Sequence, residues 1–325
     1  MQIHYVSSLL TTTLIAGFVG AASTRGQQTP PQEPGATFRT DTRLVVLHAT
    51  VVDKSGRFVT DLPQSAFTVF ESGVQQQIKT FRREDVPVSL GLVIDNSGSM
   101  RDKRAKVEAA ALALVKDSNR EDEVFIVNFN DEAFLDNPHH KDFTNNIKEL
   151  EEALTRIDSR GGTAMRDALR MSIDHVKGKG KKDKKVLVAV TDGNDNSSMI
   201  SIENLVKSSQ QTEVLIYAVG ILGEEERREA QRARRSLESL VQATGGAAFF
   251  PKDVSEVDRI AHQVARDIRN QYTIIYSPSN TAMDNTFRPI KITVKAPGNP
   301  IARTRSGYYA TPDQGIPPAN SGLKK

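Results

Sequence analysis

Residues 90–99 read Leu-Gly-Leu-Val-Ile-Asp-Asn-Ser-Gly-Ser, an apolar run that ends in side chains carrying oxygen. A short, nearly continuous apolar run is typical of a strand buried on both faces. Three similar runs follow along the chain, at residues 124–127, 186–190 and 214–219. Together they predict a parallel sheet covered by helices on both sides.

Helical patterns alternate with these runs. Apolar residues recur at helical spacing, or the composition favours a helix, in residues 102–117, 164–176, 201–209, 227–243 and 254–270. Strands that alternate with helices predict an α/β fold with a doubly wound, mostly parallel, Rossmann-like sheet. We place this domain at residues 86–270.

Segments rich in β-branched residues lie on both sides of the α/β domain, in residues 39–85 and 271–310. The first region contains a hairpin pattern around the turn at residues 71–73. The second contains candidate strands at residues 272–276, 290–295 and 302–309. Because edge strands need partners, we expect the two regions to join into one small sandwich-like unit. Two separate β appendages are the alternative.

The start of the chain resembles an export signal. Residues 6–23 carry no charge, and their compact apolar part is shorter than the roughly 20 residues that a membrane crossing needs. We predict a signal peptide at 1–23, a linker at 24–38 and a disordered tail at 311–325. The protein would then be periplasmic or extracellular, without an integral span after cleavage. An uncleaved anchor and a buried helix are the alternatives for the first segment.

Composition excludes several classes of protein. The chain has 325 residues, a net charge of +3 and no Cys. A charge this small gives no general reason to expect nucleic-acid binding. Without Cys there is no disulfide, thiolate nucleophile or Cys-ligated metal centre.

Polar side chains follow the predicted strands where each strand ends. Asp95, Ser97 and Ser99 follow the first strand, Asp192 follows a later one, and Thr163 lies in a Gly-rich loop before a helix. Ligands bind at the carboxyl ends of strands in such folds. Two carboxylates and three hydroxyls are hard oxygen donors that suit Mg²⁺.

These residues resemble a known family. Asp95, Ser97 and Ser99 match the D-x-S-x-S pattern of von Willebrand factor A domains, and Thr163 and Asp192 match that family's later Thr and Asp. The resemblance implies a metal-ion-dependent adhesion site. It implies that the hydroxyls ligate Mg²⁺ or Mn²⁺ and that the Asp residues act directly or through water. An Asp or Glu carboxylate of a partner protein would complete the shell.

The resemblance covers residues 86–270. Residues 67–78 and 305–310 look more loosely like exported bacterial proteins of the acidobacterial, von Willebrand factor A-related type. The resemblance thus implies a non-enzymatic, metal-dependent, protein-binding module. A scaffold in which the metal only rigidifies loops, and a metal-dependent hydrolase, are the alternatives.

Other features of the sequence have simpler interpretations. Residues 192–203 imitate an EF-hand loop but place Ser where the loop needs Gly. The lysines of residues 177–185 and the charges of residues 224–235 favour a solvated loop and an exposed helix, with phosphate or lipid contact and a binding face as alternatives. Residues 139–140, two His, are interpreted as surface. Ser99 could serve as a helix cap instead of a ligand.

Overall fold

The computed structural model describes residues 43–312 except 84, 157, 194 and 223–226. The predicted signal peptide, the linker and the tail from residue 313 onward lie outside the described residues. Within the described part, no helix combines the length and apolar character that a bilayer crossing requires.

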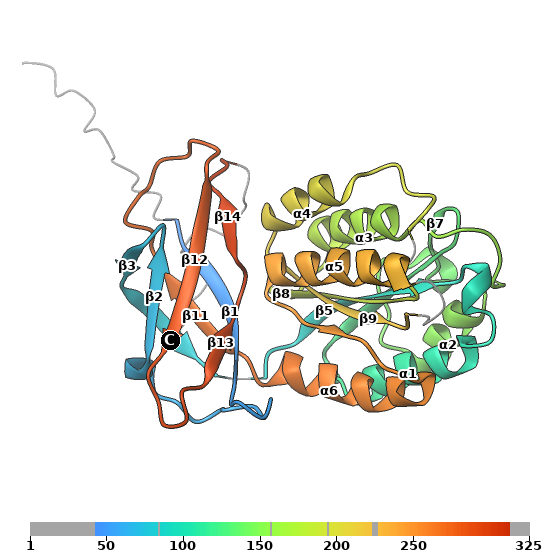
Figure 1. The fold of residues 1–325 in the computed structure, drawn as a ribbon, viewed down its shortest axis with the longest axis horizontal. Helices are drawn as coiled ribbons and strands as arrows, with labels where there is room; N and C mark the ends of the chain where they lie inside the picture. The colour runs from blue at the N-terminus through green and yellow to red at the C-terminus, as the bar shows by residue number, and fades with distance from the viewer. Residues whose placement is uncertain (1–42, 84, 157, 194, 223–226, 313–325) are drawn as a thin grey trace, which may run out of the picture. The chain divides into compact units, whose positions relative to one another are not determined.

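A six-stranded sheet forms the centre of the α/β domain (Figure 1). Its strands, in spatial order, are β10 (Ala248–Phe249), β9 (Val214–Gly220), β8 (Lys184–Thr191), β5 (Val88–Asp95), β6 (Glu123–Phe129) and β7 (Ala133–Leu135). All neighbours are parallel except β7, which is antiparallel to β6. Every residue of β5 is buried, as its apolar run predicts.

Helices cover both faces of this sheet (Figure 1). One apolar core lies under α1 (Arg104–Lys116), α2 (Ile147–Thr155) and α6 (Val257–Arg269). The other lies under α3 (Met165–Lys179), α4 (Ile202–Gln210) and α5 (Arg227–Thr244). The predicted doubly wound α/β class is confirmed.

Gly91 shows how tightly the central strand is packed. A Cβ atom at this position would lie 2.4 Å from the ring of Phe125 and 2.5 Å from the side chain of Leu187. The larger side chains of the two neighbouring strands therefore occupy the space above the centre of β5. Only glycine fits there without displacement.

The β-rich part consists of two four-stranded sheets built from both ends of the described chain. One sheet has the order β13 (Ile301–Arg303), β1 (Val45–Val52), β11 (Tyr272–Tyr276) and β4 (Ile78–Arg82). The other has the order β14 (Gly307–Tyr309), β12 (Phe287–Val294), β2 (Phe67–Glu71) and β3 (Val74–Gln76). Their inner faces share one apolar core. The α/β domain is thus inserted between β4 and β11.

Two strands differ from the prediction because the chain changes sheet within them. The hairpin expected around residues 71–73 forms between β2 and β3 only. After Gln77 the chain crosses to the other sheet and continues there as β4. The expected single strand at residues 302–309 is wrong, because it divides into β13 and β14 in different sheets. Arg305 lies at the crossing, buried, and its guanidinium donates to the carbonyls of Gly307 and Gln210.

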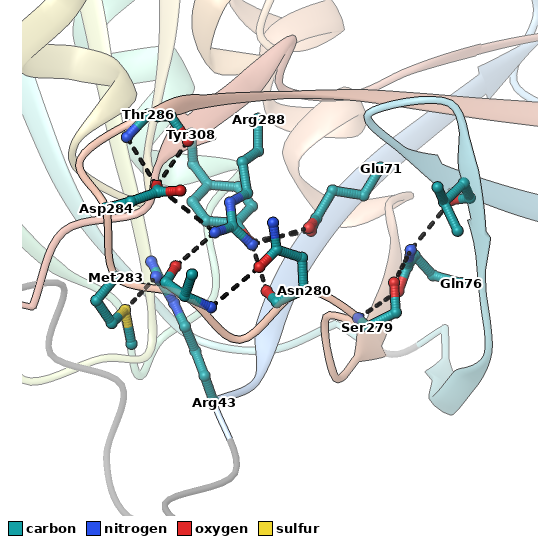
Figure 2. Close-up of polar contacts among 12 residues, drawn as sticks. Arg43, Glu71, Gln76, Ser279, Asn280, Met283, Asp284, Thr286, Arg288 and Tyr308 are labelled. Atoms are coloured by element: carbon teal, nitrogen blue, oxygen red, sulfur yellow. Dashed lines mark hydrogen bonds and ion pairs between the residues drawn. The ribbon is translucent and has the colours of Figure 1, made fainter.

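A buried ion pair holds the interior of the β-rich part (Figure 2). Glu71 lies 3.5 Å from the guanidinium of Arg288 and accepts hydrogen bonds from the hydroxyls of Tyr276 (2.7 Å) and Tyr308 (2.9 Å). Arg288 also donates to the carbonyl of Asn280, in the loop before β12. The carboxylate is fully partnered, which is what a buried charge requires.

Asp267, near the end of α6, joins the helix to the β-rich part. It is buried, accepts a 2.6 Å hydrogen bond from the hydroxyl of Thr50 in β1, and forms an ion pair with Arg303 in β13. Gln271 donates to Thr50 and to the hydroxyl of Tyr217 in β9. Side chains at the end of the last helix and just after it thus contact β1 and β13 of the β-rich part and β9 of the α/β domain.

Candidate functional site

The candidate site lies where β5 and β8 end. These strands are parallel neighbours, so Asp95 and Thr191, their last residues, come to the same edge of the sheet. Asp192 follows Thr191 directly. Carboxyl ends of strands are the usual ligand edge of an open α/β sheet.

Asp95 is a buried carboxylate, 2% exposed. Its Oδ1 accepts a 2.8 Å hydrogen bond from the backbone N–H of Ser97, and its Oδ2 accepts a 2.6 Å bond from the hydroxyl of Thr191. Burial raises the pKa of Asp95 to about 6, and the charge of Asp192 adds to the rise, although these hydrogen bonds oppose it. A nearby cation would lower the free energy of the charged form.

The two serines place their hydroxyls together. Ser97 is 1% exposed, Ser99 is exposed, and their Oγ atoms are 3.2 Å apart. Ser99 does not begin a long helix, because α1 starts only at Arg104, with Lys103 as its N-cap. Ser97 precedes the short 3-10 turn Gly98–Met100 and makes no capping bond with its side chain. Neither hydroxyl serves as the cap of α1.

The loop of Thr163 lies against the serine loop. Gly98 N donates a 3.1 Å hydrogen bond to the carbonyl of Gly161, and Arg160 N donates a 3.0 Å bond to the carbonyl of Asn96. Thr163 itself is 3% exposed. The segment just before Thr163 therefore contacts the loop that carries Ser97 and Ser99 through its backbone.

A third loop, which contains Asn196 and Ser197, holds the backbone of Thr163. Asn196 accepts a 2.9 Å hydrogen bond from Thr163 N through its side chain, while Asn196 N and Ser197 N each donate a 3.1 Å bond to the carbonyl of Thr163. Asn196 is thus committed to this loop contact, not to an EF-hand ligand set.

Asp192 lies beside a cation supplied by the chain itself. The ammonium of Lys103 is 3.1 Å from Oδ2 of Asp192, and the Asp192 side chain is 9% exposed. Asp192 is connected to Asp95 in two ways. It directly follows Thr191, whose hydroxyl donates to Asp95, and its charge raises the pKa of Asp95. Asp95 contacts the serine loop directly, whereas the Thr163 loop contacts it through the backbone of Arg160 and Gly161.

Sequence reasoning missed three residues that shape this site: Thr191, Lys103 and Asp131. Asp131 accepts a 2.7 Å hydrogen bond from Gly162 N. Gly161 has φ +73, and a Cβ atom on it would lie 2.0 Å from the Asp131 carboxylate. The paired glycines before Thr163 were the only sequence signal of this close approach.

The structure also shows where the two histidines at 139–140 and the lysines of residues 177–185 lie. His139 and His140 are exposed and adopt φ values of 57° and 53°. Among the lysines at residues 177–185, Lys184 lies in β8, is buried, and donates to the carbonyl of Ile268 at the end of α6. Burial lowers its pKa to about 7. This lysine is a structural link, not part of a solvated loop.

The donor set fits a hard divalent cation. All five predicted side chains offer oxygen, which is the donor that Mg²⁺ and Mn²⁺ prefer. Within the described ranges, no group of three or more Asp, Glu, His or Cys side chains could hold a metal ion, so a site here depends on hydroxyls. The desolvated Asp95 and the ammonium beside Asp192 both indicate a place that favours positive charge.

Comparisons with known proteins agree on the α/β domain. Residues 90–194 match the family model of the von Willebrand factor type A domain. Integrin alpha-11 of Mus musculus is 32% identical over 110 residues, which is 33% of this chain and 9% of the integrin. Integrin alpha-11 of Homo sapiens is 35% identical over 86 residues, 25% of this chain and 7% of the integrin. The match thus spans less than a tenth of either relative.

One solved structure resembles a larger part of the chain. A von Willebrand factor type A protein from Catenulispora acidiphila superposes with a TM-score of 0.50 at 14% identity, covering 85% of this chain and 76% of that one. At this identity the likeness concerns the fold.

Proposed function

Because residues 90–194 match the family model of the von Willebrand factor type A domain, we propose that this protein binds a partner protein through a divalent cation. The observation that carries the proposal is the meeting of Asp95, Ser97 and Ser99 with the Thr163 loop at the carboxyl edge of the sheet. The cation would be Mg²⁺ or Mn²⁺. The partner would supply an Asp or Glu carboxylate, and the activity would be non-enzymatic.

The hydroxyls of Ser97, Ser99 and Thr163 would hold the ion directly. Asp95 and Asp192 would balance its charge, in part through water. A divalent ion held by neutral hydroxyls keeps its attraction for an incoming anion, so it would supply the contact for the partner's carboxylate. The hydrogen bonds from Ser97 N and Thr191 fix the orientation of Asp95.

The loop after Asp192 exposes a large apolar side chain. Met199 is 95% exposed, although its backbone N–H is fixed by a 2.8 Å hydrogen bond to Asp167 at the start of α3. Ile200 N donates to the same carboxylate. A large apolar side chain presented on a fixed backbone is suited to burial against a partner.

Export is the second part of the proposal. It rests on the uncharged segment at residues 6–23 and places the binding site in the periplasm or outside the cell. A von Willebrand factor type A domain there would act as an adhesion-type module.

Calorimetric titration of the metal-stripped chain with Mg²⁺ and Mn²⁺ tests the cation site. We expect saturable binding by the wild type and its loss in the Ser97→Ala/Ser99→Ala double variant. Binding that survives in the double variant would place the ion elsewhere. A folded wild type that binds neither ion would contradict the proposal.

Water-proton relaxation of the Mn²⁺-loaded chain tests the open position. Exchangeable water on the ion enhances relaxation, and a Glu-containing peptide should reduce the enhancement. A matched Gln-containing peptide should leave it unchanged. Equal effects of the two peptides would contradict capture of a carboxylate.

A further inference from the structure

We propose that Lys103 competes with the divalent cation for Asp192. In the ion-free protein the ammonium of Lys103 pairs with Asp192. It must move away before the ion binds, and this requirement lowers the affinity for the ion. The inference rests on the proposed function, since it assigns a regulating residue to the same site. It makes Lys103 a determinant of affinity rather than a ligand.

The geometry places the ammonium at a predicted ligand. Nζ of Lys103 is 3.1 Å from Oδ2 of Asp192, with 27% of the Lys103 side chain and 9% of the Asp192 side chain exposed. Such a partly enclosed pair is screened less by water than a surface pair. The ammonium thus neutralises the carboxylate that a divalent ion would need.

The backbone of Lys103 is fixed while its side chain can move. Lys103 N donates a 3.0 Å hydrogen bond to the carbonyl of Met100, and Val107 N donates a 3.2 Å bond to the carbonyl of Lys103. The lysine stem is long and flexible, so the ammonium can move into solvent without any change in the fold. Release of Asp192 therefore needs only a rotamer change.

Helix stability does not explain a lysine at this position. Lys103 is the N-cap of α1, Arg104 follows it, and the first turn contains no acidic residue. Positive charge at a helix N-terminus is disfavoured by the helix dipole, and lysine is a poor N-cap. The contact with Asp192 compensates for this placement, which indicates a role at the site.

Charge balance gives the expected size of the effect. Asp95 and Asp192 together match one divalent cation, so a lysine that remained would leave one excess positive charge. A ligand that binds only the minor, released form of a protein has its apparent affinity reduced by the fraction of that form. If the pair is closed for about nine-tenths of the time, removal of the ammonium raises the affinity about tenfold.

The test compares Mg²⁺ titrations of the metal-stripped wild type with Lys103→Met and Lys106→Met. Lys106 is exposed on the same helix and its charge acts on Asp253, so its replacement makes the same change in net charge while keeping the contact of Lys103 with Asp192. We expect Lys103→Met to bind Mg²⁺ about tenfold more tightly and Lys106→Met to bind like the wild type. Lys103→Arg, which keeps the charge, should gain nothing.

The outcomes separate this inference from the proposed function. Equal or weaker binding by Lys103→Met, or the same gain in Lys106→Met, would overturn the role of Lys103 while leaving the cation site intact. If neither the wild type nor any variant binds the ion, the cation site itself is wrong, and the inference is overturned with it.

Discussion

The hydroxyl of Thr191 donates a 2.6 Å hydrogen bond to the carboxylate of Asp95, so that side chains join the ends of two neighbouring strands. Gly193 N in turn donates a 3.0 Å bond to the Thr191 hydroxyl. The loop that carries Asp192 is therefore positioned by the same hydroxyl that orients Asp95. The two carboxylates of the proposed site are thus linked through Thr191.

Ion binding should weaken at acidic pH. Burial raises the pKa of Asp95 to about 6, and a protonated carboxyl no longer balances the charge of a cation. Below about pH 6 the Mg²⁺ affinity should fall by up to tenfold per pH unit. Titrations at a series of pH values, with circular dichroism to verify folding, measure this. An affinity that is constant from about pH 7 to about pH 5 would contradict the assignment.

Asp95→Asn should abolish ion binding and remove the pH dependence of stability that Asp95 contributes. The folded-state pKa of Asp95 lies above its unfolded value, so the folded chain binds more protons between about pH 4 and 6 and loses stability as pH rises through that window. The amide can accept only one of the two hydrogen bonds that Asp95 accepts, and this cost is the same at every pH. The free energy of unfolding of the variant, relative to that of the wild type, should therefore be about 2 kcal/mol higher at about pH 8 than at about pH 4. Denaturant unfolding of both proteins at the two pH values measures this, and a relative stability that does not rise with pH would count against the buried charge.

Asp131→Ala should weaken ion binding although Asp131 is not a proposed ligand. Its carboxylate accepts the Gly162 N–H and so holds the loop that ends in Thr163. We expect about tenfold lower Mg²⁺ affinity, close to the value of one lost hydrogen bond. Asp131→Asn keeps an acceptor and should retain most of the affinity. If Asn is as damaging as Ala, then Asp131 acts through its charge instead.

The contact between His262 in α6 and Asp117, directly after α1, should make stability depend on pH. The hydrogen bond and the charge of Asp117 raise the pKa of His262 above its usual value. The stabilisation is therefore complete below the ordinary histidine pKa, about 6.5, and is lost as pH rises through the raised value. The difference in unfolding midpoint between wild type and His262→Gln should shrink with rising pH. Asp117→Asn should remove that trend, and a difference that grows with pH would refute it.

The sequence predicts the α/β domain well because its strands are continuous apolar runs. α2 escapes prediction because a nine-residue helix buries only Leu150, Ala153 and Leu154, too few to establish a period. Lys184 escapes for another reason, since it stands among surface lysines and its partner, Ile268, is 84 positions away. The contacts of Lys103 and Asp131 are likewise long-range, and no local pattern reveals them.

The insertion of the α/β domain between β4 and β11 determines an order of assembly. During synthesis the ribosome releases the whole α/β domain before β11. The α/β domain can therefore fold while β1 and β4 still lack β11, the strand that pairs with both. Arg82 pairs with Thr273, which means that the folded domain brings its own entry and exit together. A loop closure across the entire insert thereby becomes a short one, with a smaller entropic cost. The α/β domain thus brings together the strands with which the two sheets of the β-rich part are completed.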